Sequence, residues 1–168
     1  MSQPLLAVSL FFHIVATVVW IGGLFTLTIL VWPEMRRVLA ENQPLYSLLQ
    51  RLRKRFMPLS NLALATLIVT GLFQMTADPN YDGVMQFNNE WSQVMLFKHI
   101  TIIGMAISGL LLQYGVIPAL ERASLLIERD KGDPEVYAKL RGREVRLTWL
   151  NVGLGMLVLG FSAWATSI

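Results

Sequence analysis

Two histidines supply the side chains best suited to metal chemistry in this sequence, and both lie in long apolar runs. His13 stands within FHIVATVVWIGGLF (12–25), and His99 stands within VMLFKHITIIGMAISG (94–109). Imidazole nitrogen is a common ligand of iron and copper in proteins. Ionisable side chains inside membrane segments are rare and mark functional sites by default. His13 and His99 are therefore candidate metal ligands.

The elements that must position these histidines are membrane helices. The 168 residues are 54% hydrophobic and 15% charged, which is too apolar for a soluble domain of this length. Segments 5–31, 56–76, 94–117 and 147–166 each hold the ~20 mostly apolar residues that cross a bilayer. The sequence predicts an all-α integral membrane protein, with 1–168 forming a single transmembrane domain and an up-and-down four-helix bundle. The absence of cysteine excludes disulfide scaffolds and thiolate sites.

The basic residues predict how this bundle is oriented. All but one of the 14 Lys and Arg residues lie in 32–55 or 118–146, whereas 77–93 holds acidic residues and no basic one. The positive-inside rule places both basic connections in the cytoplasm and both termini on the outer, periplasmic side of the inner (plasma) membrane. The basic cluster RLRKR at 51–55 lies directly before a membrane-spanning segment. Its expected partner is therefore anionic membrane lipid, and we do not expect it to bind nucleic acid. Helical spacing at 120–130 predicts that the third helix extends into the cytoplasm.

The two histidines are expected at matching depths. At about 1.5 Å per residue, His13 lies ~12 Å and His99 ~9 Å from the outer start of its span, which places both in the outer leaflet. The first and third helices run in the same direction and face each other across a four-helix bundle. Small residues share the two histidine faces: Ala16 and Gly23 on the first helix, and Ala106 on the third.

A matched pair of imidazoles above small residues is the arrangement that bis-histidine ligation of a haem iron requires. The sequence therefore predicts haem b, bound by His13 and His99 in the outer leaflet. The alternative is that each histidine hydrogen-bonds a serine, a threonine or a backbone carbonyl and binds no metal.

Two neighbouring residues fit the same site and also have structural explanations. Trp20 lies two turns below His13, where it could pack on the macrocycle or belong to the core. Lys98 is the one basic residue outside the two basic connections. Its ammonium group could bind a haem propionate or an anionic substrate, or extend to the outer interface as lysines near helix ends do.

The motifs in the first three helices resemble a known family. HIVATVVWIGGLF (13–25), RFMPLSNLALATLIVTGLF (55–73) and the W-x6-K spacing from Trp91 to Lys98 are similar to copper-resistance protein D (CopD) and to the related HemJ-type protoporphyrinogen oxidases. The resemblance implies a compact integral membrane protein. In HemJ-type members it also implies b-type haem with His13 as a ligand and a functional lysine at Lys98. His99 is supported by the depth argument alone.

The leading functional hypothesis is a haem b membrane redox protein, an oxidoreductase that transfers electrons between quinone and an outer-side acceptor. The second is copper transport or resistance, because Met75, Met85 and Met95 lie near the outer face and thioethers suit Cu(I). The third is protoporphyrinogen oxidation, which rests on the resemblance.

The fourth helix carries no histidine in LNVGLGMLVLGFSAWA (150–165) and is predicted to be a packing surface. Its glycines Gly153, Gly155 and Gly160 would allow close contact within the bundle or across a homodimer.

Overall fold

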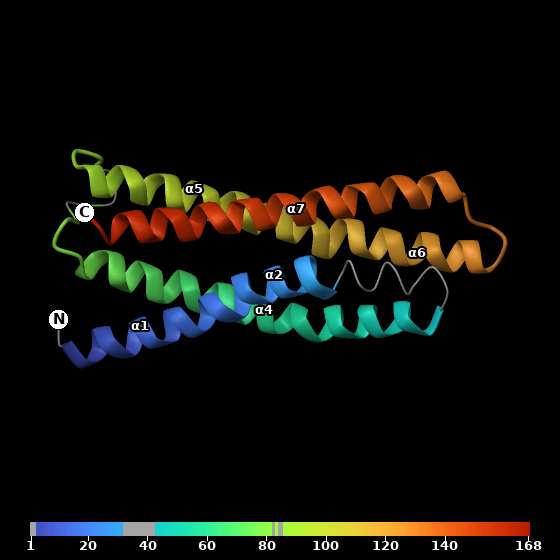
Figure 1. The fold of residues 1–168 in the computed structure, drawn as a ribbon, viewed down its shortest axis with the longest axis horizontal. Helices are drawn as coiled ribbons and strands as arrows, with labels where there is room; N and C mark the ends of the chain where they lie inside the picture. Colours follow the sequence, from blue (N-terminus) through green and yellow to red (C-terminus); the bar gives the residue numbers. More distant parts are fainter. Residues whose placement is uncertain (1–2, 32–42, 82, 84–85) are drawn as a thin grey trace. The chain divides into compact units, whose positions relative to one another are not determined.

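The computed structural model describes residues 3–31, 43–81, 83 and 86–168 (Figure 1). The described residues form helices and turns and no strand, which confirms the all-α prediction. Four helices are long and apolar enough to cross a membrane; they are Gln3–Val31, Lys54–Ala77, Glu90–Ile127 and Pro134–Ala165. The four predicted spans are therefore confirmed as helices, and the protein is a multi-pass membrane protein by helix length and composition.

The chain divides into two compact units, Met1–Gln86 and Phe87–Ile168. Each unit is a helical hairpin, and each is described below by itself. The single transmembrane domain over 1–168 stays a prediction.

The first helix of the first unit alternates between two helical forms. Its segments are α1 (Gln3–Thr17), η1 (Val18–Gly22), α2 (Gly23–Phe25) and η2 (Thr26–Val31), where η denotes a π-helix. A π-helix bonds each N–H to the carbonyl five residues earlier, so its turn is wider than an α-helical turn. Such turns are frequent at functional sites.

The wide turns change which residues face the second helix. The buried residues of the first helix are Ser9, Ala16, Ile21 and Thr28. Ser9 and Ala16 are seven residues apart, as are Ile21 and Thr28, and seven residues make about two α-helical turns. The step from Ala16 to Ile21 is only five residues, and it passes through η1. The uniform i+3/i+4 spacing assumed for the sequence therefore does not describe the helix beyond Thr17.

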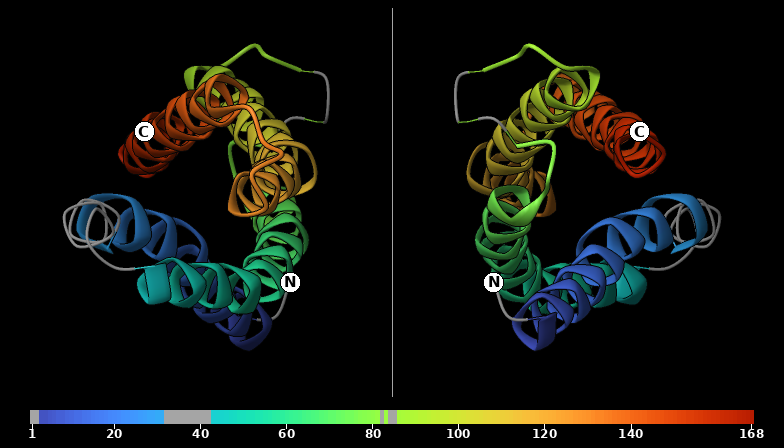
Figure 2. Two further views of the ribbon diagram at one scale, coloured as in Figure 1. Left: turned by 90° about the vertical axis from the view of Figure 1, so that its right-hand side faces the viewer. Right: turned by 90° about the vertical axis from the view of Figure 1, so that its left-hand side faces the viewer.

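The second helix of the first unit is α4 (Gln43–Ala77), which begins well before the predicted span at 56. It packs along α1, as the views in Figures 1 and 2 show. A Cβ atom added to Gly23 would overlap the ring of Phe56 on α4. Gly23 therefore brings the two helices close together, and the Phe56 ring fills the space that its missing side chain leaves.

The second unit pairs a long interrupted helix with a continuous one. Its segments are α5 (Glu90–Leu110), η3 (Leu111–Val116), α6 (Ile117–Glu128) and α7 (Pro134–Ala165). α7 lies alongside α5 and α6 (Figure 2). The predicted helical extension at 120–130 is confirmed by α6, while α7 begins 13 residues before the predicted start at 147.

Both helices of this unit have side-chain caps at their starts. Asn89 Oδ1 accepts a hydrogen bond from the backbone N–H of Ser92 at 2.7 Å, and Asp133 Oδ1 accepts one from the N–H of Glu135 at 2.8 Å. These bonds satisfy helix N–H groups that have no partner within the helix.

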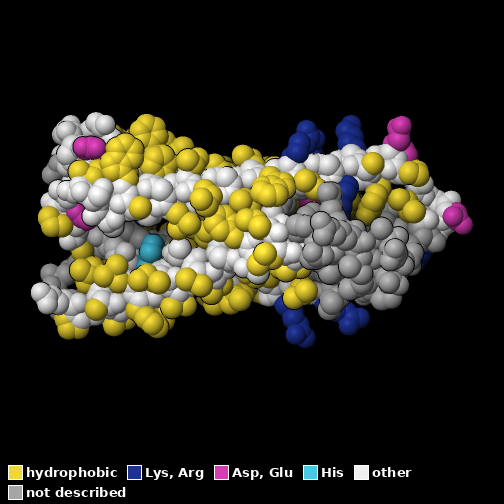
Figure 3. Space-filling view, in the orientation of Figure 1, with side chains coloured by type: hydrophobic (Ala, Val, Ile, Leu, Met, Phe, Trp, Pro, Cys, Tyr) yellow, Lys and Arg dark blue, Asp and Glu magenta, His cyan; other side chains and the backbone are white. Residues whose placement is uncertain are grey.

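The surface of the second unit separates apolar from basic side chains. Large hydrophobic residues are exposed along its helices, among them Ile103, Ile107 and Leu157, at 58%, 54% and 51%. In Figure 3, Lys and Arg side chains gather over the first half of α7 and hydrophobic ones over its second half. An exposed apolar surface of this extent is typical of a helix hairpin in contact with lipid.

Gly23→Ala should destabilise the protein, because the added methyl group overlaps the Phe56 ring. Overpacking of this kind costs about 1–3 kcal/mol of unfolding free energy. Thermal unfolding in detergent micelles measures the change. Adding Phe56→Leu to Gly23→Ala should restore part of the loss, and a single variant as stable as the wild type would contradict the close approach.

Candidate functional site

His13 lies on α1 against α4, about three turns from the start of its helix. Its Nδ1 is 2.8 Å from Thr70 Oγ1, so the imidazole is bonded to the neighbouring helix. A Cβ atom on Gly71 would lie 3.4 Å from His13 Cε1, which shows that the ring edge lies directly over this glycine. The His13 side chain therefore occupies a place formed by two successive residues of α4.

Further polar side chains surround this contact. Gln74 Nε2 donates a hydrogen bond to Ser9 Oγ at 3.3 Å, and Ser9 Oγ donates to the Thr70 carbonyl at 3.5 Å. We call Ser9, His13, Thr70 and Gln74 the His13 cluster. In hydrocarbon an unbonded polar group costs several kcal/mol, so these bonds stabilise the pairing of α1 with α4.

The two sequence motifs of this unit meet each other at two places. The histidine of HIVATVVWIGGLF contacts Thr70 and Gly71, the late Thr-Gly pair of RFMPLSNLALATLIVTGLF. Gly23, the second glycine of the first motif, contacts Phe56, near the start of the second. The motif residues are thus the residues through which the two helices pack.

His99 lies on α5, also about three turns from the helix start. Its Nδ1 is 2.6 Å from the backbone carbonyl of Met95, one turn earlier. A carbonyl only accepts hydrogen bonds, so Nδ1 carries the hydrogen and the lone pair of the neutral ring is on Nε2. Ser92, a buried residue of α5, lies seven residues before His99 and therefore on the same side of the helix, and His99 itself is half-buried.

The haem prediction requires His13 and His99 to face each other, and it stays a prediction because they belong to different units. Each imidazole does make the type of hydrogen bond that the alternative expected, with a threonine for His13 and a carbonyl for His99. Since an imidazole has two nitrogens, a bond at Nδ1 is compatible with a ligand role for Nε2.

The other predicted site residues have varied surroundings. Ala16 is 5% exposed, and Trp20, Gly23, Lys98 and Ala106 are half-buried. Within the part of the chain that the structure describes, Lys98 makes no ion pair or hydrogen bond.

The structure describes two of the three methionines that are candidate thioether ligands. Met75 and Met95 are half-buried, and Met85 lies outside the described residues. No group of three or more His, Cys, Asp or Glu side chains that could hold a metal occurs among the described residues.

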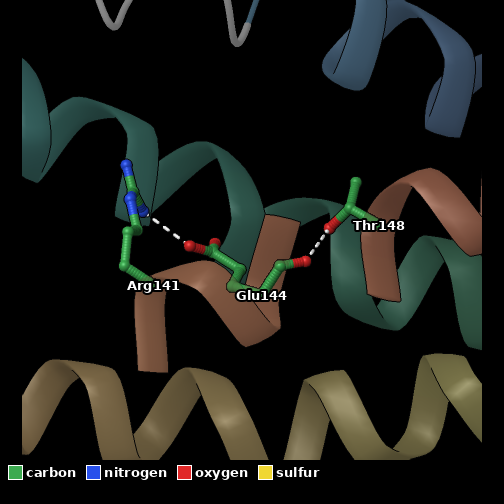
Figure 4. Close-up of polar contacts among 3 residues, drawn as sticks. All are labelled: Arg141, Glu144 and Thr148. Atoms are coloured by element: carbon green, nitrogen blue, oxygen red, sulfur yellow. Dashed lines mark hydrogen bonds and ion pairs between the residues drawn. The ribbon is translucent and has the colours of Figure 1, made fainter. Parts of the chain in front are cut away.

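A buried ion pair on α7 is a feature that sequence reasoning missed. The Glu144 side chain is 1% exposed, and its Oε2 lies 2.6 Å from Nη1 of Arg141 (Figure 4). The Thr148 hydroxyl donates to the Glu144 backbone carbonyl at 2.8 Å. The sequence contains a pattern that could have predicted this ion pair. Glu144 is the one acidic residue from 136 to the end of the sequence, and Arg141 lies one turn earlier.

A second polar contact joins α5 and α7. Ser108 Oγ donates to Asn151 Oδ1 at 2.6 Å, and the two residues are 4% and 5% exposed. Gly109 lies beside the amide, since a Cβ atom there would be in van der Waals contact with Asn151 Nδ2 at 4.0 Å. The prediction of the fourth helix as a packing surface was incomplete, because it overlooked Asn151.

The glycines of α7 divide between two faces. Gly155 is buried, whereas Gly153 and Gly160 are exposed, and a Cβ atom on either would meet nothing within 4 Å. Close packing within the unit involves Gly155, and the homodimer stays a prediction.

Comparison with known proteins gives one family match. The family model described as copper resistance protein D matches residues 50–165. The matched region includes Thr70, Lys98 and His99, and it begins after His13. No curated protein and no solved structure matches the chain.

Arg141→Gln should lower the free energy of unfolding by an amount near the low end of the ~3–5 kcal/mol measured when a buried ion pair loses one partner. The low end applies because the Arg141 side chain is 17% exposed. Arg143→Gln, an exposed change on the same helix, is the matched control and should have little effect. Thermal unfolding of both variants, and of Arg141→Gln/Glu144→Gln, is the measurement; a double variant no more stable than Arg141→Gln would refute the pairing argument.

Proposed function

Because the chain belongs to the copper resistance protein D family, we propose that it binds copper within the membrane and contributes to copper transport or resistance. The observation that carries this proposal is the His13 imidazole, held between two membrane helices by Thr70 and Gly71. Copper is the cargo in this proposal, and the His13 ring is its principal ligand.

The donor atoms present suit Cu(I). Imidazole and thioether are ligands that this soft ion accepts. Met75 lies one helical turn beyond Gly71 on α4, and Met95 lies one turn before His99 on α5. In the second unit a thioether therefore lies one turn from an imidazole. In the first unit a thioether lies one turn from the glycine that contacts the imidazole. With no cysteine in the chain, these groups are its available soft and intermediate ligands.

The orientation of the protein is part of the proposal. We place both termini on the outer side of the inner membrane, because the described basic residues other than Lys98 lie near the α4 start and on α6, α7 and the turn between them. His13 and His99 then lie toward the outer side, where copper would be bound or released.

His13→Ala should weaken Cu(I) binding by at least about 10-fold, since even loss of a residue that only supports a ligand costs 10–100-fold in metal affinity. Phe12→Ala, a change of the exposed neighbour, is the matched control. Anaerobic competition with a Cu(I) chelator, on protein in detergent micelles, gives the affinity. Unchanged binding by His13→Ala would refute His13 as the principal ligand.

Haem b is the second candidate, because His99 presents the Nε2 lone pair that an axial ligand needs and both histidines lie about three turns from the start of their helices. The filling of the Gly23 space by Phe56 counts against a flat macrocycle at that level. Electron transfer with quinone, oxidoreductase activity and protoporphyrinogen oxidation all depend on this candidate.

An absorption spectrum of protein purified after haem supplementation separates the two candidates. Under the copper proposal it shows no Soret band. A Soret band with reduced α and β bands that disappear in His13→Ala would favour haem and displace the copper proposal.

A further inference from the structure

The hydroxyl group of Thr70 has one hydrogen and two close polar neighbours. Thr70 Oγ1 lies 2.6 Å from the Thr66 carbonyl oxygen and 2.8 Å from His13 Nδ1. Two oxygens 2.6 Å apart need a hydrogen between them, and a carbonyl oxygen can only accept, so the hydroxyl hydrogen points to Thr66. Toward His13, Thr70 therefore presents a lone pair.

A lone pair on Thr70 determines which nitrogen of His13 carries a hydrogen. The contact at 2.8 Å is a hydrogen bond only if Nδ1 is the donor. In the neutral ring the second nitrogen, Nε2, then holds the lone pair.

We propose that Thr70 is a positioning residue that holds neutral His13 as the Nδ1–H tautomer, so that Nε2 is the nitrogen offered to a metal. The proposal deepens the copper proposal and rests on it for the identity of the metal. The tautomer itself is a property of the metal-free protein.

The rest of the His13 cluster supports this arrangement. Ser9 Oγ donates to the Thr70 backbone carbonyl at 3.5 Å, which ties Thr70 to α1 by a second bond. Gly71 lies beside Cε1, the carbon between the two ring nitrogens, since a Cβ atom at this position would be in van der Waals contact with the ring edge at 3.4 Å. The hydrogen-bond direction is thus fixed by α4 itself, running from His13 Nδ1 to Thr70 Oγ1 and on to the Thr66 carbonyl.

Nitrogen NMR of protein labelled with ¹⁵N-histidine tests the proposal directly, because the chain has only 2 histidines. The spectrum of the metal-free protein at a pH where the rings are neutral is assigned with His13→Ala. We expect a protonated Nδ1 and an unprotonated Nε2 for His13. A His13 ring protonated on Nε2 in the wild type would overturn the proposal without any variant.

Two substitutions separate the hydroxyl group from the shape of the side chain. Thr70→Ser keeps the hydroxyl and should keep the wild-type His13 signals, whereas Thr70→Val removes the acceptor and should give a mixture of tautomers. The His99 signals are an internal control and should not change, because His99 Nδ1 bonds the Met95 carbonyl. Unchanged His13 signals in Thr70→Val would overturn the proposal.

The same variants link the tautomer to the metal. Thr70→Val should bind Cu(I) about 10-fold more weakly than the wild type, and Thr70→Ser should bind it nearly as well. If the wild type shows the expected tautomer while His13→Ala binds Cu(I) normally, the copper proposal fails and the positioning role of Thr70 stands.

Discussion

The lack of water inside a membrane is the constraint on which this structure depends. A polar side chain there must find a partner on its own helix or on a neighbouring one. Among the described residues, every buried side-chain nitrogen or oxygen has a hydrogen-bond partner. Between the helices of the first unit the part-buried His13 bonds Thr70, and between those of the second Ser108 bonds Asn151, while Arg141 pairs with Glu144 within α7. Each hairpin is therefore held in register by a polar contact within an apolar interface.

The same requirement links structure to function at His13. A ring that bonds Thr70 through Nδ1 is a satisfied membrane histidine, and the same bond orients it as a ligand, since metal-bound histidines commonly donate their other ring N–H to a partner. The structural and functional explanations of this histidine are therefore compatible. Under the copper proposal, the second nitrogen of His13 is the atom that binds the metal.

The sequence was a good guide to the spans because ~20 consecutive apolar residues have few folded alternatives to a membrane helix. It also singled out His13, and the Thr-Gly pair as part of a family motif. It could not show that Thr70 bonds the imidazole, since this depends on how α1 and α4 pack. Hydropathy also missed the helix start at Gln43, because the first turns of α4 are too polar to count as part of an apolar span. Asn151 was overlooked because one amide barely changes the hydropathy of an apolar helix.

The wide turns of the first helix bear on how its sequence should be compared with others. A π-helical turn accommodates one residue more than an α-helical turn, much as a single-residue insertion does. Suppose that a relative with a strictly α-helical first helix is aligned with this chain without a gap. Beyond η1, each residue of this chain then takes the place in space that the relative fills with the residue one position earlier in the alignment. An alignment that ignores η1 can match His13 correctly and still assign Gly23 to the wrong face.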